Sequence, residues 1–244
     1  MPKRCISLEM AELEIDGGIL PLTLKRNARA RRMILRLDRS GKGVVLTLPT
    51  RASRQRALEF ARTHAHWIRS RLSAVPKPVP FSAGAIIPLR GIPHEIRHTQ
   101  TLRGRVRLVP EEAGTAGYVE VTGDQGHLAR RLRDWLKAES KKELVAASSA
   151  YAKAMAVIFH KISVRDQSSR WGSCSANGQL SYSWRLILAP SFVLDYVAAH
   201  EVAHLVHMNH GAKFWALVAR HCPDYQKARA WMKRHGKELH SYGV

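Results

Sequence analysis

The residues with the clearest chemical potential form the run His200-Glu201-Val202-Ala203-His204. On a helix, two histidines four residues apart lie one turn apart, so both imidazoles can reach a single point beside the helix. A zinc ion at that point would acidify a bound water toward a pKa of about 7. Glu201 would then lie close enough to accept a proton from that water. The pattern therefore predicts a zinc-dependent hydrolase with His200 and His204 as ligands and Glu201 as the catalytic base.

Two histidines further along the chain compete to be the third ligand. His207 continues the stripe of His200 and His204, but three donors along one straight helix cannot surround a tetrahedral ion. His210 is flanked by Asn209 and Gly211, which end helices and allow the chain to fold back. We therefore favour His210 as the ligand and expect His207 to line the pocket and contribute to substrate binding. Three neutral imidazoles leave the fourth position open, as in catalytic sites.

The elements that must position these residues fall into two parts. Residues 1–125 contain mainly short β-branched segments separated by turns, with one helix, and predict a mostly antiparallel β domain. Residues 126–244 predict a long helix, a strand at 161–166, a hairpin around Ala176-Asn177-Gly178, the helix that carries the motif, and two short C-terminal helices. No internal repeat is apparent. The predicted fold class is therefore α+β, with the hydrolase domain in residues 126–244.

The chain is strongly basic, with 40 Lys and Arg against 19 Asp and Glu and a formal net charge of +21. The densest basic run is Lys25–Arg32, which lacks the interleaved aromatic residues that stack on bases. The run predicts affinity for polyanions and non-specific nucleic-acid contact, with a solvated turn as the alternative.

The N-terminal residues lack the apolar stretch of a signal peptide, and the longest apolar run, Leu186–Ala199, is too short to span a bilayer. The three cysteines form no CxxC pair, which argues against a disulfide framework. We therefore expect a cytoplasmic protein with no membrane association.

Several motifs together resemble the YgjP-like metallopeptidase family, whose core is shared by SprT-like and WLM-type proteins. The motifs that carry the resemblance are Arg26–Leu37, Arg170–Ser175, Trp184–Leu186, His200–His204, Asn209-His210, Phe214-Trp215, Pro223–Tyr225 and Trp231. The resemblance implies a zincin-like domain with a long backing helix, a small sheet and an active-site helix. It also implies His210 as the third zinc ligand, although His207 stands where related H-E-x-x-H-x-x-G-x-x-H proteins have glycine.

Several residues outside the motif have either a functional or a structural role in the sequence interpretation. Arg170 lies in a strand that would border the cleft, so it either contacts substrate or is a solvated edge residue. Trp171 and Trp184 are expected in the core, Cys174 as a small buried side chain, and Phe214 and Trp215 in helix packing. Four residues are equal candidates for stabilising the oxyanion: Tyr182, Tyr196, His207 and Arg170.

The sequence is compatible with three functions. The first is a zinc metallopeptidase acting on a peptide or protein substrate. The second uses the same centre to hydrolyse the phosphoanhydride of a nucleoside triphosphate, because the positive charge suits an anionic nucleotide. The third is a nucleic-acid-associated protein whose site is a peptidase or is vestigial.

Overall fold

The computed structural model describes residues 8–15, 17–38, 41, 43–73, 75–101, 104–112 and 117–244. Contacts divide the chain into two compact units, residues 1–76 and residues 77–244. The division suggested by the sequence pattern, at residues 125 and 126, lies inside the second unit. The reason is that the sheet formed by residues 86–122 shares one hydrophobic core with the helices and strands that follow it.

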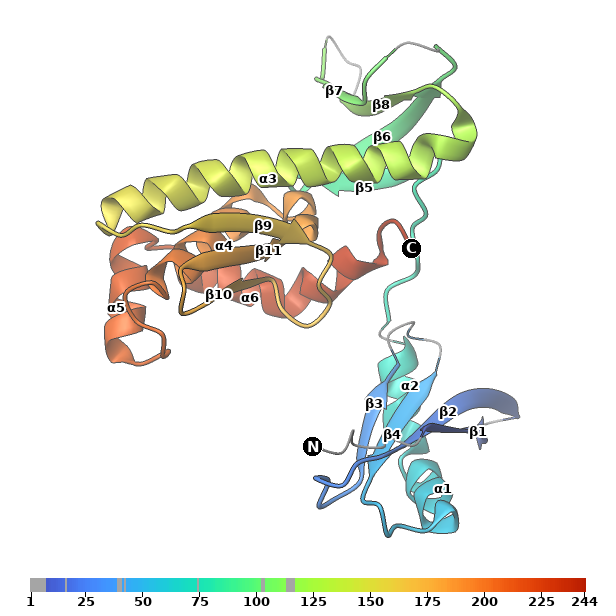
Figure 1. Ribbon diagram of the computed structural model, residues 1–244. Coiled ribbons are helices and arrows are strands. Elements are labelled where there is room, and N and C mark those ends of the chain that lie inside the picture. Colours follow the sequence, from blue (N-terminus) through green and yellow to red (C-terminus); the bar gives the residue numbers. More distant parts are fainter. Residues whose placement is uncertain are drawn as a thin grey trace. The chain divides into compact units, whose positions relative to one another are not determined.

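The first unit is a four-stranded sheet followed by two helices (Figure 1). Its elements are β1 (Leu8–Ile15), β2 (Gly18–Arg26), β3 (Ile34–Leu37), β4 (Val44–Leu48), α1 (Arg54–Thr63) and α2 (Ala65–Ser73). The strand order is β1-β2-β4-β3, with β2 and β4 parallel and the outer pairs antiparallel. Alternate strand residues such as Leu22, Leu24 and Leu46 are buried with Ala57, Ala61 and Ile68 of the helices. This unit therefore has its own core.

The helical segment of this unit is two helices, whereas the sequence pattern suggested one. The break occurs at His64, whose φ and ψ of −102° and 18° are not helical. The ring nitrogen Nδ1 of His64 and the hydroxyl of Thr63 both lie within hydrogen-bonding distance of the Phe60 carbonyl oxygen, at 2.8 and 2.9 Å. Side chains that bond to backbone carbonyls in this way compete with the helical hydrogen bonds.

The second unit contains two sheets, one long helix and a group of shorter helices. Its strands are β5 (Ile86–Leu89), β6 (Ile92–Thr99), β7 (Arg107–Val109), β8 (Tyr118–Thr122), β9 (Lys161–Arg165), β10 (Gly172–Cys174) and β11 (Gln179–Ser183). Its α-helices are α3 (Leu128–Ala154), α4 (Ser191–Ala203), α5 (Ala212–His221) and α6 (Tyr225–His235). Short 3₁₀ segments are η1 (Gln125–His127), η2 (Trp184–Leu188) and η3 (Gly236–Ser241).

The first two sheets have the same topology. The second has the order β5-β6-β8-β7, with a parallel central pair and antiparallel outer pairs, as in β1-β2-β4-β3. Each sheet is also followed by a helical segment. The chain therefore repeats one architecture twice, although no repeat is apparent in its sequence.

Helix α3 backs the part of the second unit that carries the motif (Figure 1). Its buried positions, which include Leu132, Leu136 and Leu144, share one core with α4 and the third sheet. That sheet has the order β10-β11-β9, and the β10–β11 hairpin turns at Gly178, where φ is +66°. Trp184 is fully buried, as expected. The α+β class and the arrangement of backing helix, small sheet and motif helix are confirmed.

Among the described residues, no helix is both long enough and apolar enough to cross a lipid bilayer.

Candidate metal centre

The H-E-x-x-H run lies at the end of α4, a helix buried on nearly all sides. The helix ends at Ala203, and His204 is its C-cap residue. Turns continue to residue 206, held by bonds such as that from the His207 amide to the Ala203 carbonyl, at 3.0 Å. The sequence pattern extended the helix to Asn209, so the true end comes earlier. This early end lets the chain turn back.

The loop after α4 returns His210 to the first two histidines. The Nε2 atoms of His200 and His210 are 3.0 Å apart. One ligand nitrogen from each of His200, His204 and His210 lies within 4.8 Å of the others. Nitrogens that share a tetrahedral ion at bond lengths of about 2.0–2.1 Å lie about 3.3 Å apart. The three histidines that the sequence analysis selected thus lie together in a group that could hold a metal ion.

The outer nitrogens of two of these rings have their own partners. His204 Nδ1 lies 3.1 Å from the carbonyl oxygen of His207, which can only accept a hydrogen bond. The hydroxyl of Tyr196 lies 3.3 Å from Nδ1 of His200. A proton on Nδ1 leaves Nε2 with the lone pair that a metal requires. The His207 carbonyl therefore favours a proton on Nδ1 of His204, and the Tyr196 hydroxyl can accept the corresponding proton of His200.

The electrostatics of the cluster favour neutral imidazoles. Burial, together with the neighbouring His204 and His210, lowers the pKa of His200 to about 3. Burial also lowers the pKa of His204, and the charge of His210 adds to this, although its bond to the His207 carbonyl opposes it. Neutral rings are the form that binds a metal ion.

Glu201 lies between α4 and the edge strand β10. Its side chain is buried, and a Cβ atom built on Gly172 would lie 2.6 Å from its Cγ and 2.7 Å from its Cδ. Position 172 therefore has to lack a side chain for the carboxylate to occupy this place. Burial raises the pKa of Glu201 to about 8, and the charge of Arg170 opposes this rise. Burying a carboxyl group in this way costs folding stability, and catalytic sites often hold carboxyl groups in such water-poor positions.

The ring of Phe214 packs against all three imidazoles. This buried ring lies 4.9, 4.6 and 4.8 Å, between centroids, from His200, His204 and His210. Trp215 packs beside His200 and His210 at 5.8 and 5.7 Å. Both residues therefore pack α5 against the histidine cluster, in line with the packing role expected from the sequence.

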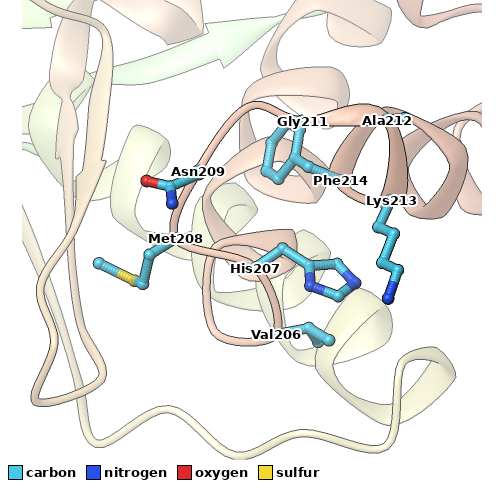
Figure 2. A pocket seen from close by; sticks show the side chains of 8 residues that line it. All are labelled: Val206, His207, Met208, Asn209, Gly211, Ala212, Lys213 and Phe214. Atoms are coloured by element: carbon cyan, nitrogen blue, oxygen red, sulfur yellow. The ribbon is translucent and has the colours of Figure 1, made fainter.

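The side chain of His207 is not part of the cluster. Figure 2 shows it on the loop after α4, extending to the same side as Lys213. Residues 206–209 and 211–214 surround a hollow of about 380 Å³ there. His207 thus lines a pocket, as expected, while its carbonyl positions His204.

Arg170 lines a second hollow, of about 440 Å³, beside β10. Other polar side chains around it include Arg165, Gln167 and Ser173. The Gln167 amide nitrogen is buried there without a hydrogen-bond partner among the described residues. Because the charge of Arg170 also acts on Glu201, this arginine lies near the site.

The structure separates the two tyrosines considered as oxyanion stabilisers. Tyr182 is fully buried, and its hydroxyl is 3.0 Å from that of Ser148. The hydroxyl of Tyr196 faces the outer nitrogen of His200. Tyr182 is therefore occupied elsewhere, and Tyr196 is placed to orient a ligand.

The sequence did not predict three roles in the site. These are the close contact of Gly172 with Glu201, the contact of Tyr196 with His200, and the packing of Phe214 against the three imidazoles. Tyr196 precedes His200 by four residues, so helical spacing alone places it beside that ring. Gly172, in contrast, gives no signal of its own, because its role depends on how β10 packs on α4.

The α+β fold, together with a three-histidine cluster that could hold a metal ion, defines a domain of the metal-binding class. The family model of the YgjP-like metallopeptidase domain matches residues 31–235, and the chain belongs to the YgjP-like family. The family implies a metal ion and a peptidase-like function. No curated protein and no solved structure shows significant similarity to the chain.

Proposed function

We propose that the protein is a zinc-dependent peptidase in which Glu201 is the general base and His200, His204 and His210 are the metal ligands. The observation that carries this proposal is the convergence of the three ligand nitrogens within 4.8 Å, with the buried Glu201 carboxylate next to the first ligand. Three imidazoles suit zinc and leave a coordination position for substrate chemistry.

When bound, zinc would supply Lewis acidity, which polarises a carbonyl oxygen and acidifies water. The chain supplies the rest. Tyr196 and the His207 carbonyl hold the rings of His200 and His204 in position. Glu201 accepts a proton from the attacking water on a carboxylate oxygen and delivers it to the leaving amine nitrogen. A nearby dication favours the ionised form of Glu201, because an opposite charge lowers the pKa of a carboxyl group.

The free edge of β10 offers a place for an extended peptide. Trp171 and Ser175 bond to β11 through the pairs Ser183 N to Trp171 O, at 2.9 Å, and Ser175 N to Gln179 O, at 3.0 Å. Bonded pairs alternate along an antiparallel ladder, so the backbone groups of Gly172 and Cys174 face away from β11. In the described part of the chain no strand pairs with that edge. A peptide added there would lie beside Glu201.

A second candidate substrate is an anionic nucleotide, whose phosphoanhydride would be cleaved at the same centre. The hollow beside β10 favours it, because Arg165 and Arg170 line it together with several serine hydroxyls. The side chain of neither arginine has a hydrogen-bond or ion-pair partner among the described residues. Guanidinium groups of this kind bind phosphate oxygens.

The test is a substrate panel on the purified full chain: casein-type proteins and peptides on one side, nucleoside triphosphates on the other. Each assay compares the zinc-loaded protein, the chelated protein and the Glu201→Gln variant. We expect zinc-dependent peptide cleavage that the variant loses. Zinc-dependent release of pyrophosphate that Arg170→Gln weakens would assign the second substrate instead. Hydrolysis that persists in Glu201→Gln would contradict both. For location we propose the cytoplasm, in keeping with the free thiols of Cys174 and Cys222.

A further inference from the structure

One end of the first sheet gathers cationic side chains. Strand β2 ends at Arg26, β4 ends at Leu48, and β3 begins at Ile34, so the connections 27–33 and 49–53 leave the same end of the sheet. The loops are joined by the bond from the Asn27 amide to the Leu48 carbonyl, at 3.0 Å. Their cationic residues are Arg29, Arg31, Arg32 and Arg51, all exposed. We call this set the arginine end.

Local bonds hold this end in shape. Nη1 of Arg26 donates to the carbonyl oxygens of Thr50 and Ala52, at 2.9 and 2.7 Å. Within the first loop, the Arg29 amide donates to Oδ1 of Asn27 at 2.9 Å, which forms an Asx turn. Arg26 therefore holds the 49–53 connection, and the Asx turn shapes the start of the 27–33 connection.

The exposed arginines have no partners within the described residues. No hydrogen bond, ion pair or ring contact joins the side chains of Arg29, Arg31, Arg32 or Arg51 to another residue in the described part of the chain. Glu9, the acidic residue nearest this end in the sheet register, is paired with Arg54 at 2.9 Å. The other described acidic residues of the unit lie toward the opposite end of the sheet or within a helix: Glu12, Glu14, Asp38 and Glu59. Among the described residues, no unpaired acidic side chain therefore lies at the arginine end.

The repeated topology supplies an internal comparison. The equivalent connection of the second sheet, between β6 and β7, leads into Arg107, which donates to Glu120 of the neighbouring strand at 2.6 Å. Arg131 in addition donates to the Gly104 carbonyl in that connection, at 2.7 Å. In the second sheet, the arginine that begins β7 is thus paired and Arg105 is exposed in the connection, whereas the first sheet presents Arg29, Arg31 and Arg32 together in one exposed connection.

We propose that the arginine end binds the phosphodiester backbone of nucleic acid without reading its sequence. Exposed, unpaired guanidinium groups can bind phosphate oxygens in bidentate fashion and release counterions from the polyanion. No aromatic residue belongs to the 27–33 and 49–53 connections, so the surface lacks the stacking platforms that recognise single bases. The surface belongs to a unit that does not contain the histidine cluster, and it is independent of the proposed peptidase function.

The test measures binding of the full chain to a fluorescently labelled 20-base-pair duplex by anisotropy, at several salt concentrations. The test variant carries Arg29→Gln, Arg31→Gln and Arg32→Gln. The matched control carries Lys141→Gln, Lys142→Gln and Arg234→Gln, which remove the same charge from exposed positions of the second unit. We expect the dissociation constant of the test variant to rise about tenfold or more, and its salt slope to fall by about three. The control should stay within about twofold of the original protein.

Thermal unfolding of both variants should match the original chain, because the altered side chains are exposed and make no hydrogen bond, ion pair or ring contact with another described residue; this separates lost binding from lost folding. Binding should also survive chelation of metal and the Glu201→Gln change. The proposal is overturned if control and test variants lose the same affinity, or if the test variant binds as the original chain does. Tighter binding of a polyglutamate peptide than of the duplex would overturn it as well, and would assign the surface to an acidic protein.

Discussion

Gly172 of β10 packs directly against the side chain of Glu201 on α4, with no room for a Cβ atom between them. A methyl group at position 172 must push the carboxylate out of its place beside His200. We therefore expect Gly172→Ala to lower kcat/KM by about 100-fold, because a displacement of about 1 Å in a catalytic group costs that much. Zinc content should be unchanged, since no ligand moves.

The control for this prediction is Gly211→Ala. Gly211 lies next to His210, but a Cβ atom there meets nothing within 4 Å. Activity of this variant should therefore match that of the original chain. Equal activity of Gly172→Ala and Gly211→Ala would show that the contact with Glu201 does not govern catalysis.

The ligand assignment predicts different effects at two neighbouring histidines. His210→Ala removes a ligand and should weaken zinc binding by more than about 100-fold, the upper range for losing a supporting residue. His207→Ala should keep its zinc, because only the backbone carbonyl of His207 bonds to His204. Elemental analysis after dialysis measures both. Zinc loss confined to His207→Ala would contradict the assignment.

Tyr196 should act on the metal through His200. Tyr196→Phe removes the hydroxyl 3.3 Å from Nδ1 of His200 and should weaken zinc affinity about tenfold. Tyr182→Phe is the control, because this buried tyrosine bonds to Ser148 and not to a histidine. It should cost about 1 kcal/mol of unfolding free energy and leave zinc affinity unchanged. A competition titration with a chelator distinguishes the two, and equal affinities in both variants would rule out an orienting role for Tyr196.

Arg185 should be a structural residue. Its buried guanidinium donates to Asp166 at 2.7 and 3.2 Å and to the carbonyls of Leu239 and Tyr242 at 2.9 and 2.7 Å. Arg185→Gln should therefore destabilise the fold by about 3 kcal/mol, because it removes a buried charged donor and leaves the carbonyls of Leu239 and Tyr242 without that donor, whereas the Asp166 side chain is 44% exposed. Denaturant unfolding measures this, and a change below about 1 kcal/mol would contradict it.

The same ion pair predicts a pH dependence. Burial raises the pKa of Asp166, but the hydrogen bond and charge of Arg185 outweigh it and hold the pKa below its ordinary value of 3.8. The stabilisation is complete above that value and is lost as the pH falls through the lower pKa of the folded state. Asp166→Asn should therefore flatten the fall in unfolding free energy below about pH 4, whereas Asp134→Asn, at an exposed pair, should not.

The convergence of His200, His204 and His210 could be predicted from the sequence because it depends mainly on residue spacing. Two histidines four residues apart need only a helix, and His210 needs only a chain reversal near Gly211. The roles of Gly172 and Phe214 were not accessible in this way, since each depends on a contact between elements distant in the chain. Helix α4 likewise ends before Asn209, where the Leu205 and Val206 amides bond to the Val202 and Ala203 carbonyls in tight turns that helical periodicity does not reveal.

The repeated sheet was also invisible in the sequence. Strand pairing depends on which strands exchange hydrogen bonds, and two sets of unrelated β-branched residues can adopt the same order. The pattern of alternating residues therefore predicted strands but neither the parallel pairs β2–β4 and β6–β8 nor the shared core of β5–β8 with α3. Because β5–β8 share this core with α3, the boundary between the two compact units lies before β5.

The most direct test of the central claim is the rate of peptide hydrolysis by zinc-reconstituted Glu201→Gln beside the reconstituted original chain. The amide keeps the size of the carboxylate and, since Glu201 is not a ligand here, should keep the zinc. We predict equal zinc stoichiometry and a fall in kcat of about 10²–10⁴-fold, the usual contribution of a general base. A variant that holds zinc and cleaves at the original rate would contradict the claim that Glu201 is the catalytic base of this centre.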